Sequence, residues 1–502
     1  MNQKDSLDKR VDLPEKFVLT DEFKNIFDQM ENTKKNLFIT GKAGCGKSTL
    51  LEYFRQKTKK NFAVLSFTGL ASLRVRGNTI HSFFKFPPRF IRQYDPDIRL
   101  HRNPAVLKNL DTIIIDECSA VRADLLDAID ESLKKNRKNE KIFGGVQIIL
   151  IGDLLQLAPI TGGAENESIE KTYPDGAFFF NARVFNSAKF KTLELTKIFR
   201  QSDEFFIDLL NKFRLAKVED EDLDFINTRF VGEDFETPEG VIQLSTVNSK
   251  VDKINEDKLN KIKSKSFTYT AQIKDKFKRE MPAPETLVLK VGAQVMCLAN
   301  EKEQKWVNGT IAIVKELNEK EIKIGIGDKI YLINKFQWEQ YEYDCTGSVV
   351  IPKIVGRYIQ FPLKLAWAAT IHKCQGQTFK DVVIDMDRGS FCHGQTYVAL
   401  SRATSIEGIH LKREINRGDL VFDKRVFNFL GTELEKKYIT EIDSFRGTSK
   451  KNVSEVEKWS TKDEKKLISL YKKKVPEIAL ARILNKTTSE VRHKILELLK
   501  FN

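Results

Sequence analysis

Short apolar runs alternate with amphipathic segments along the N-terminal part of the chain. The runs are Asn36–Thr40, Phe62–Phe67, Thr112–Ile115, Val146–Ile151 and Leu193–Leu195. Strands that are apolar on both faces are typical of a parallel sheet covered by helices on each side. We therefore predict an α/β unit, with its ligand chemistry at the carboxyl ends of the strands.

The pattern changes in the second half of the chain. Val241–Asn248 predicts another buried strand, and residues 285–360 contain short strands separated by Gly and Asn turns. Regular short strands of this kind are typical of a small β-barrel. The parallel-sheet pattern returns with Val382–Met386 and ends near Gly431. We therefore expect a second α/β unit that carries an antiparallel insert.

The C-terminal residues form a third pattern. Residues 441–458 are polar and predict a linker, whereas apolar positions at helical spacing in residues 459–502 predict three short helices similar to a helix-turn-helix. Two interpretations of this unit stay open, DNA binding and docking to another protein. Basic residues surround its predicted turn and third helix: Arg482, Lys486, Arg492 and Lys494.

Composition narrows the class of protein. The 84 basic and 70 acidic residues give a net charge of +14, which favours a polyanionic partner. The six cysteines are scattered without a CxxC pair, which suits reduced thiols better than disulfides or zinc ligands. No apolar run approaches the roughly 18 residues of a membrane span, and the N-terminus lacks a signal core, so we expect a cytoplasmic protein.

A phosphate-binding pattern follows the first predicted strand. Gly41, Gly46, Lys47 and Ser48 complete the spacing G-x-x-x-x-G-K-[ST]. Glycines allow backbone N–H groups to surround a phosphate, the lysine reaches the β- and γ-phosphates, and the serine hydroxyl ligates Mg²⁺. ATP and Mg²⁺ are the expected cofactors. The residues expected to bind the nucleotide here are Gly41, Ala43, Gly44, Cys45, Gly46, Lys47, Ser48 and Thr49.

Two later strands end in polar groups suited to the same reaction. Asp116 and Glu117 follow an apolar run, and we predict that Asp116 holds Mg²⁺ while Glu117 polarises the attacking water. Gln156 follows the next run as a neutral group suited to sensing the γ-phosphate, and Asp153 supports it. The sequence therefore predicts nucleotide hydrolysis rather than nucleotide binding alone.

With these residues in place, the chain resembles the Pif/RecD branch of superfamily 1 DNA helicases (superfamily 1B). The similarity is ordered along residues 15–430 and departs at Cys118, Ala158 and Cys374. The family's adenine-reading glutamine has no clear equivalent in Leu19–Phe23. The motifs that carry the resemblance are Ser66–Ser72 with Gly77–Phe83, Asp116–Ser119, Gly152–Leu157, Leu195–Gln201, Ala368–Thr378 and Tyr397–Arg402.

The resemblance implies two RecA-like motor domains, residues 1–189 and 190–440. It implies a wedge-type insert at about 83–109, an SH3-like insert at about 310–360, and a monomeric ATP-dependent DNA helicase of replication, repair or recombination that moves 5′ to 3′ on single-stranded DNA. The expected duplex substrates are forked or structured. Arg200 and Arg402 would reach across the cleft to the nucleotide, near Gly376. The residues expected to contact DNA are Thr68, Gly69, Thr79, His81 and Phe83 in the first domain and Thr246, Asn248, Thr370, His372 and Lys373 in the second.

Several alternatives stay open at this point. The aromatic and basic residues of Phe83–Tyr94 either stack on bases or form the small core of the insert. A translocase that does not separate strands, and a superfamily 1 RNA helicase, would share every motif. A regulator with a nucleotide switch is disfavoured, because binding alone does not need Glu117, Arg200 and Arg402.

Overall fold

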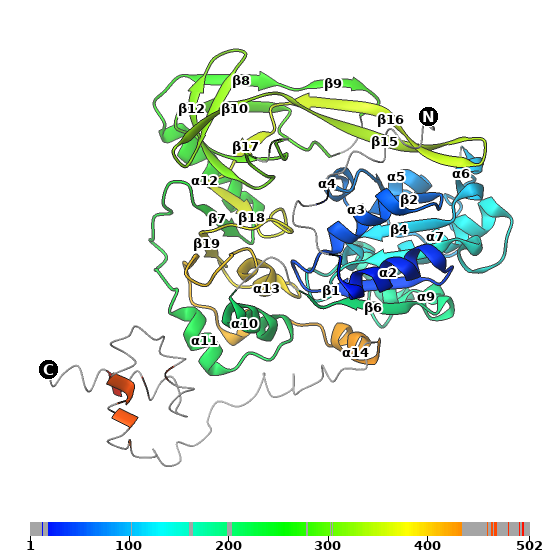
Figure 1. The fold of residues 1–502 in the computed structure, drawn as a ribbon, viewed down its shortest axis with the longest axis horizontal. Helices are drawn as coiled ribbons and strands as arrows, with labels where there is room; N and C mark the ends of the chain where they lie inside the picture. The colour runs from blue at the N-terminus through cyan, green and yellow to red at the C-terminus, as the bar shows by residue number, and fades with distance from the viewer. Residues whose placement is uncertain are drawn as a thin grey trace.

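The computed structural model describes residues 13, 19–101, 103–159, 164–197, 203–277, 280–301, 303 and 305–433, together with residues 459, 463–464, 466–468, 480, 491 and 494–495. Two parallel sheets lie beside each other, and an antiparallel part extends across both of them, at the top of Figure 1. The predicted α/β class with parallel sheets and antiparallel inserts is confirmed.

The first sheet has six parallel strands in the order β3-β2-β4-β5-β1-β6. Its register pairs Leu37 with Ile149 and Lys191, and Phe62 with Thr112, so the strands begin at one edge and end at the other. The five predicted runs all form strands, with bounds shifted by one or two residues. The strands are β1 (Leu37–Gly41), β2 (Phe62–Ser66), β3 (Asn78–Thr79), β4 (Thr112–Asp116), β5 (Gln147–Ile151) and β6 (Lys191–Leu195).

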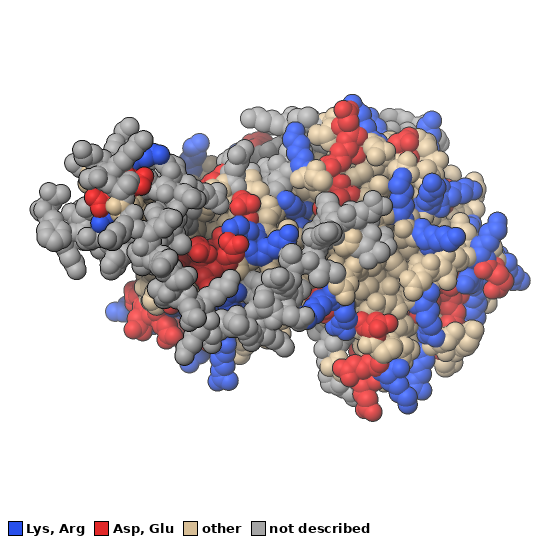
Figure 2. Space-filling view, turned by 90° about the horizontal axis from the view of Figure 1, so that it is seen from below, with Lys and Arg blue, Asp and Glu red and all other residues tan. Residues whose placement is uncertain are grey.

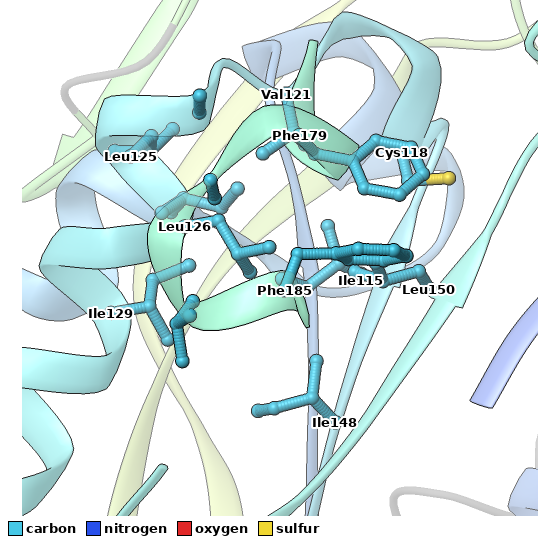
Figure 3. Close-up of a cluster of buried hydrophobic side chains, with 14 of the residues drawn as sticks. Ile115, Cys118, Val121, Leu125, Leu126, Ile129, Ile148, Leu150, Phe179 and Phe185 are labelled. Atoms are coloured by element: carbon cyan, nitrogen blue, oxygen red, sulfur yellow. The ribbon is translucent and has the colours of Figure 1, made fainter. Parts of the chain in front are cut away.

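Helices cover both faces of this sheet because neighbouring residues of each strand point to opposite sides. On one face Leu37 and Ile39 pack against two helices, whereas Phe38 between them packs into a larger core on the other face. Figure 3 shows part of the larger core, with Phe179 and Phe185 between a long helix and the strands. The helices of this unit are α2 (Asp21–Asn32), α3 (Lys47–Lys57), α4 (Gly69–Arg74), α5 (Ile80–Phe84), α6 (Pro104–Asn109), α7 (Ala123–Arg137), α8 (Ala164–Thr172) and α9 (Arg183–Ala188).

The second sheet is also parallel, in the order β18-β7-β19-β20. Its core includes Phe206 and Phe213 of one helix and Val398 of another. The predicted strand Val241–Asn248 is shorter than expected, because Asn248 begins a helix. The elements are α10 (Glu204–Arg214), α11 (Asp220–Asn227), β7 (Ile242–Ser245), α12 (Asn248–Lys261), β18 (Ala368–Thr370), β19 (Val382–Asp385), α13 (Gln395–Leu400) and β20 (Ile409–Leu411).

Antiparallel strands fill the region between β7 and β18. Five of them form one sheet in the order β14-β13-β12-β11-β17, and the short strands predicted there are all present. The two longest strands, β15 (Phe336–Thr346) and β16 (Val349–Gln360), were not predicted from the sequence. They pair to form a hairpin. The other strands are β8 (Ser266–Thr270), β9 (Gln272–Asp275), β10 (Thr286–Lys290), β11 (Gln294–Cys297), β12 (Ile311–Leu317), β13 (Ile322–Ile326), β14 (Lys329–Ile333) and β17 (Leu363–Leu365).

The hairpin joins the antiparallel part to the first sheet. It reaches over α5 and α6 in Figure 1. The hydroxyl of Tyr343 accepts a hydrogen bond of 2.8 Å from the backbone N–H of Val64 in β2, and the Tyr343 ring packs edge-on against Phe83. Near the hairpin tip, Asn61 donates to the carbonyl oxygen of Ser348 at 2.9 Å.

The chain returns to the first unit after β20. Helix α14 (Lys424–Glu433) belongs by sequence to the predicted second domain, yet its side chains pack into the first core, and Phe429 stacks on Phe180 at a centroid distance of 4.3 Å. The predicted linker, residues 441–458, lies outside the described residues. In the C-terminal unit, Trp459 packs on Leu467, Leu480, Val491 and Ile495.

Most of the C-terminal prediction lies outside the described residues, including Arg482, Lys486 and Arg492. Lys494 is described and forms an ion pair of 2.7 Å with Glu464. In the described parts of the chain, no helix is both long enough and apolar enough to cross a membrane.

The hairpin contact gives a first prediction. Tyr343→Phe removes the acceptor of the buried Val64 N–H, and a buried donor without an acceptor costs about 1–3 kcal/mol. Hydrogen exchange of the Val64 amide should therefore become roughly tenfold faster or more. The matched control is Tyr341→Phe in the same strand, whose hydroxyl donates to Glu339. Equal exchange at Val64 in the Tyr343→Phe variant and the parent would show that this contact does not hold the hairpin.

Candidate active site

The phosphate loop connects β1 to α3 at the carboxyl edge of the first sheet. Gly41 has no room for a side chain, since an added Cβ would lie 2.6 Å from the carbonyl oxygen of Leu195. Gly46 begins α3 from a left-handed conformation, with φ of 89°. The Lys47 ammonium donates to the carbonyl oxygens of Gly41 at 2.7 Å and Lys42 at 2.9 Å. The lysine is therefore held at the mouth of a loop whose N–H groups and helix N-terminus suit an anion.

Two carboxyl groups follow β4 beside this loop. Burial, and then the charge of Glu117, raise the pKa of Asp116 to about 7. Glu117 has a left-handed backbone with φ of 52°, an uncommon conformation for a residue with a side chain. Strain of this kind is often found at functional sites. A buried carboxyl with a raised pKa beside a second carboxyl suits a bound cation, which would offset the repulsion between them.

A chain of polar side chains crosses between the two sheets. Gln375, from the segment after β18, donates to Gln156 at 3.0 Å and makes a long contact of 3.5 Å with Glu117. Gln156 in turn donates to Asp153 at 3.1 Å. Asp153 pairs with Arg214 of α10 at 2.9 Å. Both members of that pair are buried, with side-chain exposures of 1% and 3%. The residues beside the phosphate loop are thus connected to the second sheet by direct contacts.

Nearby positive charges favour the ionised form of the Asp153 carboxylate. Burial alone would raise the pKa of Asp153, but the positive charges of Arg214 and Lys47 outweigh it and hold this pKa below the usual value. Tyr397 of α13 also reaches the loop, where its hydroxyl lies 3.4 Å from the Ala43 N–H. Burial raises the pKa of Tyr397 to about 12. The tyrosine is therefore a neutral contact between the units.

The two predicted arginines have different outcomes. Arg200 lies outside the described residues. Arg402 is 1% exposed and donates to the carbonyl oxygens of Val398 at 2.8 Å, Gln377 at 2.9 Å and Cys374 at 3.2 Å. In this arrangement it therefore holds the segment after β18, which includes Gly376.

The predicted DNA contacts of the first unit lie near the carboxyl ends of β2 and β3. Thr68 and Thr79 cap the helices α4 and α5, accepting hydrogen bonds from the backbone N–H groups of Ala71 and Ser82. His81 lies half-buried, and burial lowers its pKa. Gly69 faces the antiparallel part, since a Cβ there would lie 3.1 Å from that of Glu280. This surface is therefore partly covered in the present arrangement.

The second unit places its predicted DNA contacts near the carboxyl ends of β7 and β18. Thr246 and Thr370 are buried, whereas Asn248 and Lys373 are exposed. The ring of His372 lies nearly parallel to that of Phe391, at an interplanar angle of 19° and a centroid distance of 6.4 Å. Phe391 is 63% exposed, which leaves an aromatic face in solvent beside this surface.

The structure corrects one of the expected contacts. Phe83 is 3% exposed and packs against Phe84 and Tyr343, so its ring does not face solvent as base stacking would require. Other aromatic residues of the insert are buried in the same core, and Arg89 is engaged by Asp95 and Asp97. The small core is therefore the interpretation that fits the phenylalanines, whereas Tyr94 is 79% exposed.

Sequence reasoning missed several residues of the site. Gln375 lies inside a motif that was recognised, but only its neighbours received a role. Arg214 stands outside the motifs, at the end of an amphipathic helix, where an ordinary surface position is the default expectation. Phe391 precedes the last motif, and only its exposure in the fold distinguishes it from a core residue.

Comparisons with known proteins agree with this site. A family model described as PIF1-like helicase matches residues 18–223. The ATP-dependent DNA helicase Pif1 of Bdellovibrio bacteriovorus is 31% identical over 406 residues, covering 79% of this chain and 88% of that protein. The human ATP-dependent DNA helicase PIF1 is 31% identical over 420 residues, and the match spans 79% of this chain but only 61% of the human protein.

Solved structures of a Bacteroides Pif1 match as well. The unliganded protein has a TM-score of 0.77 at 36% identity, covering 84% of this chain and 98% of that chain. The protein bound to single-stranded DNA has a TM-score of 0.61 at 37% identity, covering 83% and 97%. At nearly equal identity and coverage, this chain is more similar to the unliganded structure than to the DNA-bound one, and the same protein in complex with ADP-AlF4 matches equally well, with a TM-score of 0.78.

The buried pair gives a second prediction. Arg214→Met leaves the Asp153 carboxylate buried without its arginine, which costs about 3–5 kcal/mol. Thermal unfolding should therefore occur at a lower temperature. With Arg214 present, the pKa of Asp153 is lower in the folded protein than in the unfolded chain. The pair therefore stabilises the fold fully above the pKa of the unfolded chain, and this stabilisation is lost as the pH falls through the pKa of the folded protein. In Arg214→Met the pKa of Asp153 rises, so the variant should lose more unfolding free energy relative to the parent at pH 8 than at pH 5.

The control is Lys212→Met on the same helix, which removes a more exposed partner of Asp222. It should cost about 1 kcal/mol or less. The double variant Arg214→Met/Asp153→Leu should recover most of the lost stability, because no buried charge remains. Similar unfolding temperatures for both single variants would contradict a buried link between the sheets.

Proposed function

This chain belongs to the PIF1-like helicase family, and on that basis we propose that it is an ATP-dependent DNA helicase. It hydrolyses ATP at the loop Gly41–Thr49, translocates on single-stranded DNA and separates duplex DNA. The observation that carries the proposal is the chain of contacts from Glu117 and Gln156 through Gln375 to the second sheet. A protein that only binds nucleotide has no need for such a connection between two sheets.

The residues of the first sheet suit the chemical step. Lys47 binds the β- and γ-phosphates, and Glu117 orients and deprotonates the attacking water. Ser48 and Asp116 would hold Mg²⁺, which neutralises phosphate charge when it is bound. The donor set fits this ion, since Mg²⁺ usually takes one or two protein oxygens together with phosphate and water. Gln156 senses the γ-phosphate and transmits its loss to Gln375.

The second sheet supplies the moving partner. Closure of the cleft would bring two arginines of the family motifs, Arg402 and Arg200, toward the negative charge that develops on the transferred phosphoryl group. Hydrolysis and opening would change the contact of Gln375 with Gln156, which is 3.0 Å in the present arrangement. Two surfaces hold one DNA strand, one near Thr68 and one near His372, and the distance between them then shortens and lengthens in each cycle. Repetition moves the protein along the strand, 5′ to 3′ as the family resemblance implies.

DNA entry would require the antiparallel part to move, and the SH3-like insert expected at about 310–360 lies within this part. Glu280 lies close to Gly69, and Leu73 of α4 packs in a cluster with Phe277 and Tyr358. Both contacts cover the first DNA surface. The lower TM-score with the DNA-bound Bacteroides protein supports a different arrangement of the chain when DNA is present.

Hydrolysis and unwinding assays test the proposal together. ATP hydrolysis should rise when single-stranded DNA is added, and a duplex with a 5′ tail should open faster than one with a 3′ tail. Hydrolysis without strand separation would indicate a translocase, and preference for RNA tails would indicate an RNA helicase. Hydrolysis that DNA does not stimulate would contradict the proposal.

Two variants tie this activity to the site. Lys47→Ala should abolish hydrolysis and unwinding, because it removes the cation that binds the phosphates. Glu117→Gln should retain nucleotide binding and lose hydrolysis, as expected for a base. A Lys47→Ala protein that hydrolyses ATP at the parental rate would place the reaction elsewhere.

A further inference from the structure

Lysines gather at the edge of the first sheet that lies opposite the nucleotide. Each of the five longer strands begins just after a helix, and one or more lysines lie in the connection or in the adjoining end of the helix or strand. We call this surface the basic edge. Its lysines are Lys34 and Lys35 before β1, Lys59 and Lys60 before β2, Lys108 before β4, Lys138 and Lys141 before β5, and Lys189 and Lys191 at β6.

Backbone pairing places these connections next to one another. The N–H of Lys191 donates to the carbonyl oxygen of Asn36 at 2.9 Å, and the N–H of Asp111 donates to that of Asn61 at 2.8 Å. Gln147 links the remaining strands, because its N–H donates to Asp111 and its side-chain amide donates to the carbonyl oxygen of Lys35. The basic edge is therefore one continuous surface.

Charge on this surface is strongly one-sided. The connections carry seven lysines, and Lys108 in the last turn of α6 and Lys191 at the start of β6 bring the total to nine. Three acids lie among them, Asp111, Glu140 and Glu31 at the end of α2, which accepts hydrogen bonds from Thr58 and Lys59, so the net charge is 9 − 3 = +6 against +14 for the whole chain. Figure 2 shows many Lys and Arg side chains, with some Asp and Glu among them, at its right-hand end, the end where α6, α7 and α9 lie in Figure 1.

Structural contacts involve two of the nine lysines, since the exposed Lys191 ammonium donates to the side-chain oxygen of Gln29 at 3.3 Å. Lys60 is half-buried and donates to the carbonyl oxygens of Met30 and Thr33 and to the Gln147 side chain. Burial lowers its pKa. The other lysines are exposed, and none forms an ion pair with an acidic side chain in the described parts of the chain. Unpaired like charges on neighbouring loops repel one another, so this arrangement is costly unless an anion binds.

The position of the basic edge identifies the anion. A strand of five residues spans about 17 Å, so the edge cannot reach the ATP phosphates at the other end of the sheet. The insert after β3 begins beside Thr79 and His81 on the DNA surface and ends with α6, whose last turn carries Lys108. The insert therefore leads from the proposed single-strand surface to the basic edge. Duplex DNA parted beside the insert would extend past this edge.

We propose that the basic edge binds the sugar-phosphate backbone of the duplex ahead of the separating strands. This rests on the proposed helicase function and adds a second DNA site to it. The lysines act as point charges on phosphates, without sequence preference. The site holds the duplex against the insert while the two motor units advance on one strand.

The test compares salt dependence for two DNA ligands. In Lys108→Gln/Lys138→Gln/Lys141→Gln/Lys189→Gln, the slope of log affinity against log salt for a forked duplex should become less steep. The expected change is roughly 0.9 for each duplex phosphate contact that is lost. Affinity for a single-stranded oligonucleotide and ATP hydrolysis stimulated by that oligonucleotide should match those of the parent.

The matched control changes four exposed lysines elsewhere, Lys253→Gln/Lys261→Gln/Lys320→Gln/Lys380→Gln, and lowers the net charge equally. An unchanged fork slope in the edge variant, or an equal change in the control, overturns the proposal. Equal losses on forked and single-stranded DNA overturn it as well. These outcomes differ from failure of the proposed function, in which the parent itself lacks DNA-stimulated hydrolysis.

Discussion

The common direction of the strands in each parallel sheet is the constraint on which the rest of this structure depends. Because all strands of the first sheet run the same way, every connection that leaves a strand lies at one edge and every connection that enters a strand lies at the other. The leaving connections include Gly41–Lys47, Asp116 with Glu117, and Asp153 with Gln156. The entering connections carry the lysines of the basic edge. One topological rule thus separates nucleotide chemistry from the proposed duplex site.

Communication between the two sheets depends on a few buried polar contacts. Asp153 and Arg214 are both shielded from water, where an unpaired charge is costly, so the pair favours one relative placement of the sheets. Gln375 adds a weaker contact with Gln156 and Glu117, which a change at the γ-phosphate can break or form. The Asp153–Arg214 ion pair can keep the two units together, while the weaker Gln375–Gln156 contact can change. This combination suits a cleft that opens and closes without separating the two units.

The sequence was informative wherever a local pattern determines the structure. Apolar runs located β1, β2, β4, β5 and β6 of the first sheet and β7 and β19 of the second, and glycine spacing located the phosphate loop. The short strands β3, β18 and β20 were not predicted. The hairpin β15–β16 was missed because most of its residues are only partly buried, without a regular alternation of buried and exposed positions. Its burial depends on contacts with Asn61 and Val64, which are far away in sequence. Burial of Phe83 and the role of Arg214 were unpredictable for the same reason, since both depend on tertiary partners.

The central claim is that nucleotide and DNA draw the two parallel sheets together. Fluorescence energy transfer between dyes on Lys57→Cys of α3 and Lys380→Cys before β19 measures that separation, with Cys345 and Cys392 changed to Ser. Adding ADP with aluminium fluoride and single-stranded DNA should shorten the distance, and Lys47→Ala should abolish the change. An unchanged distance in the parent under saturating conditions would contradict the account.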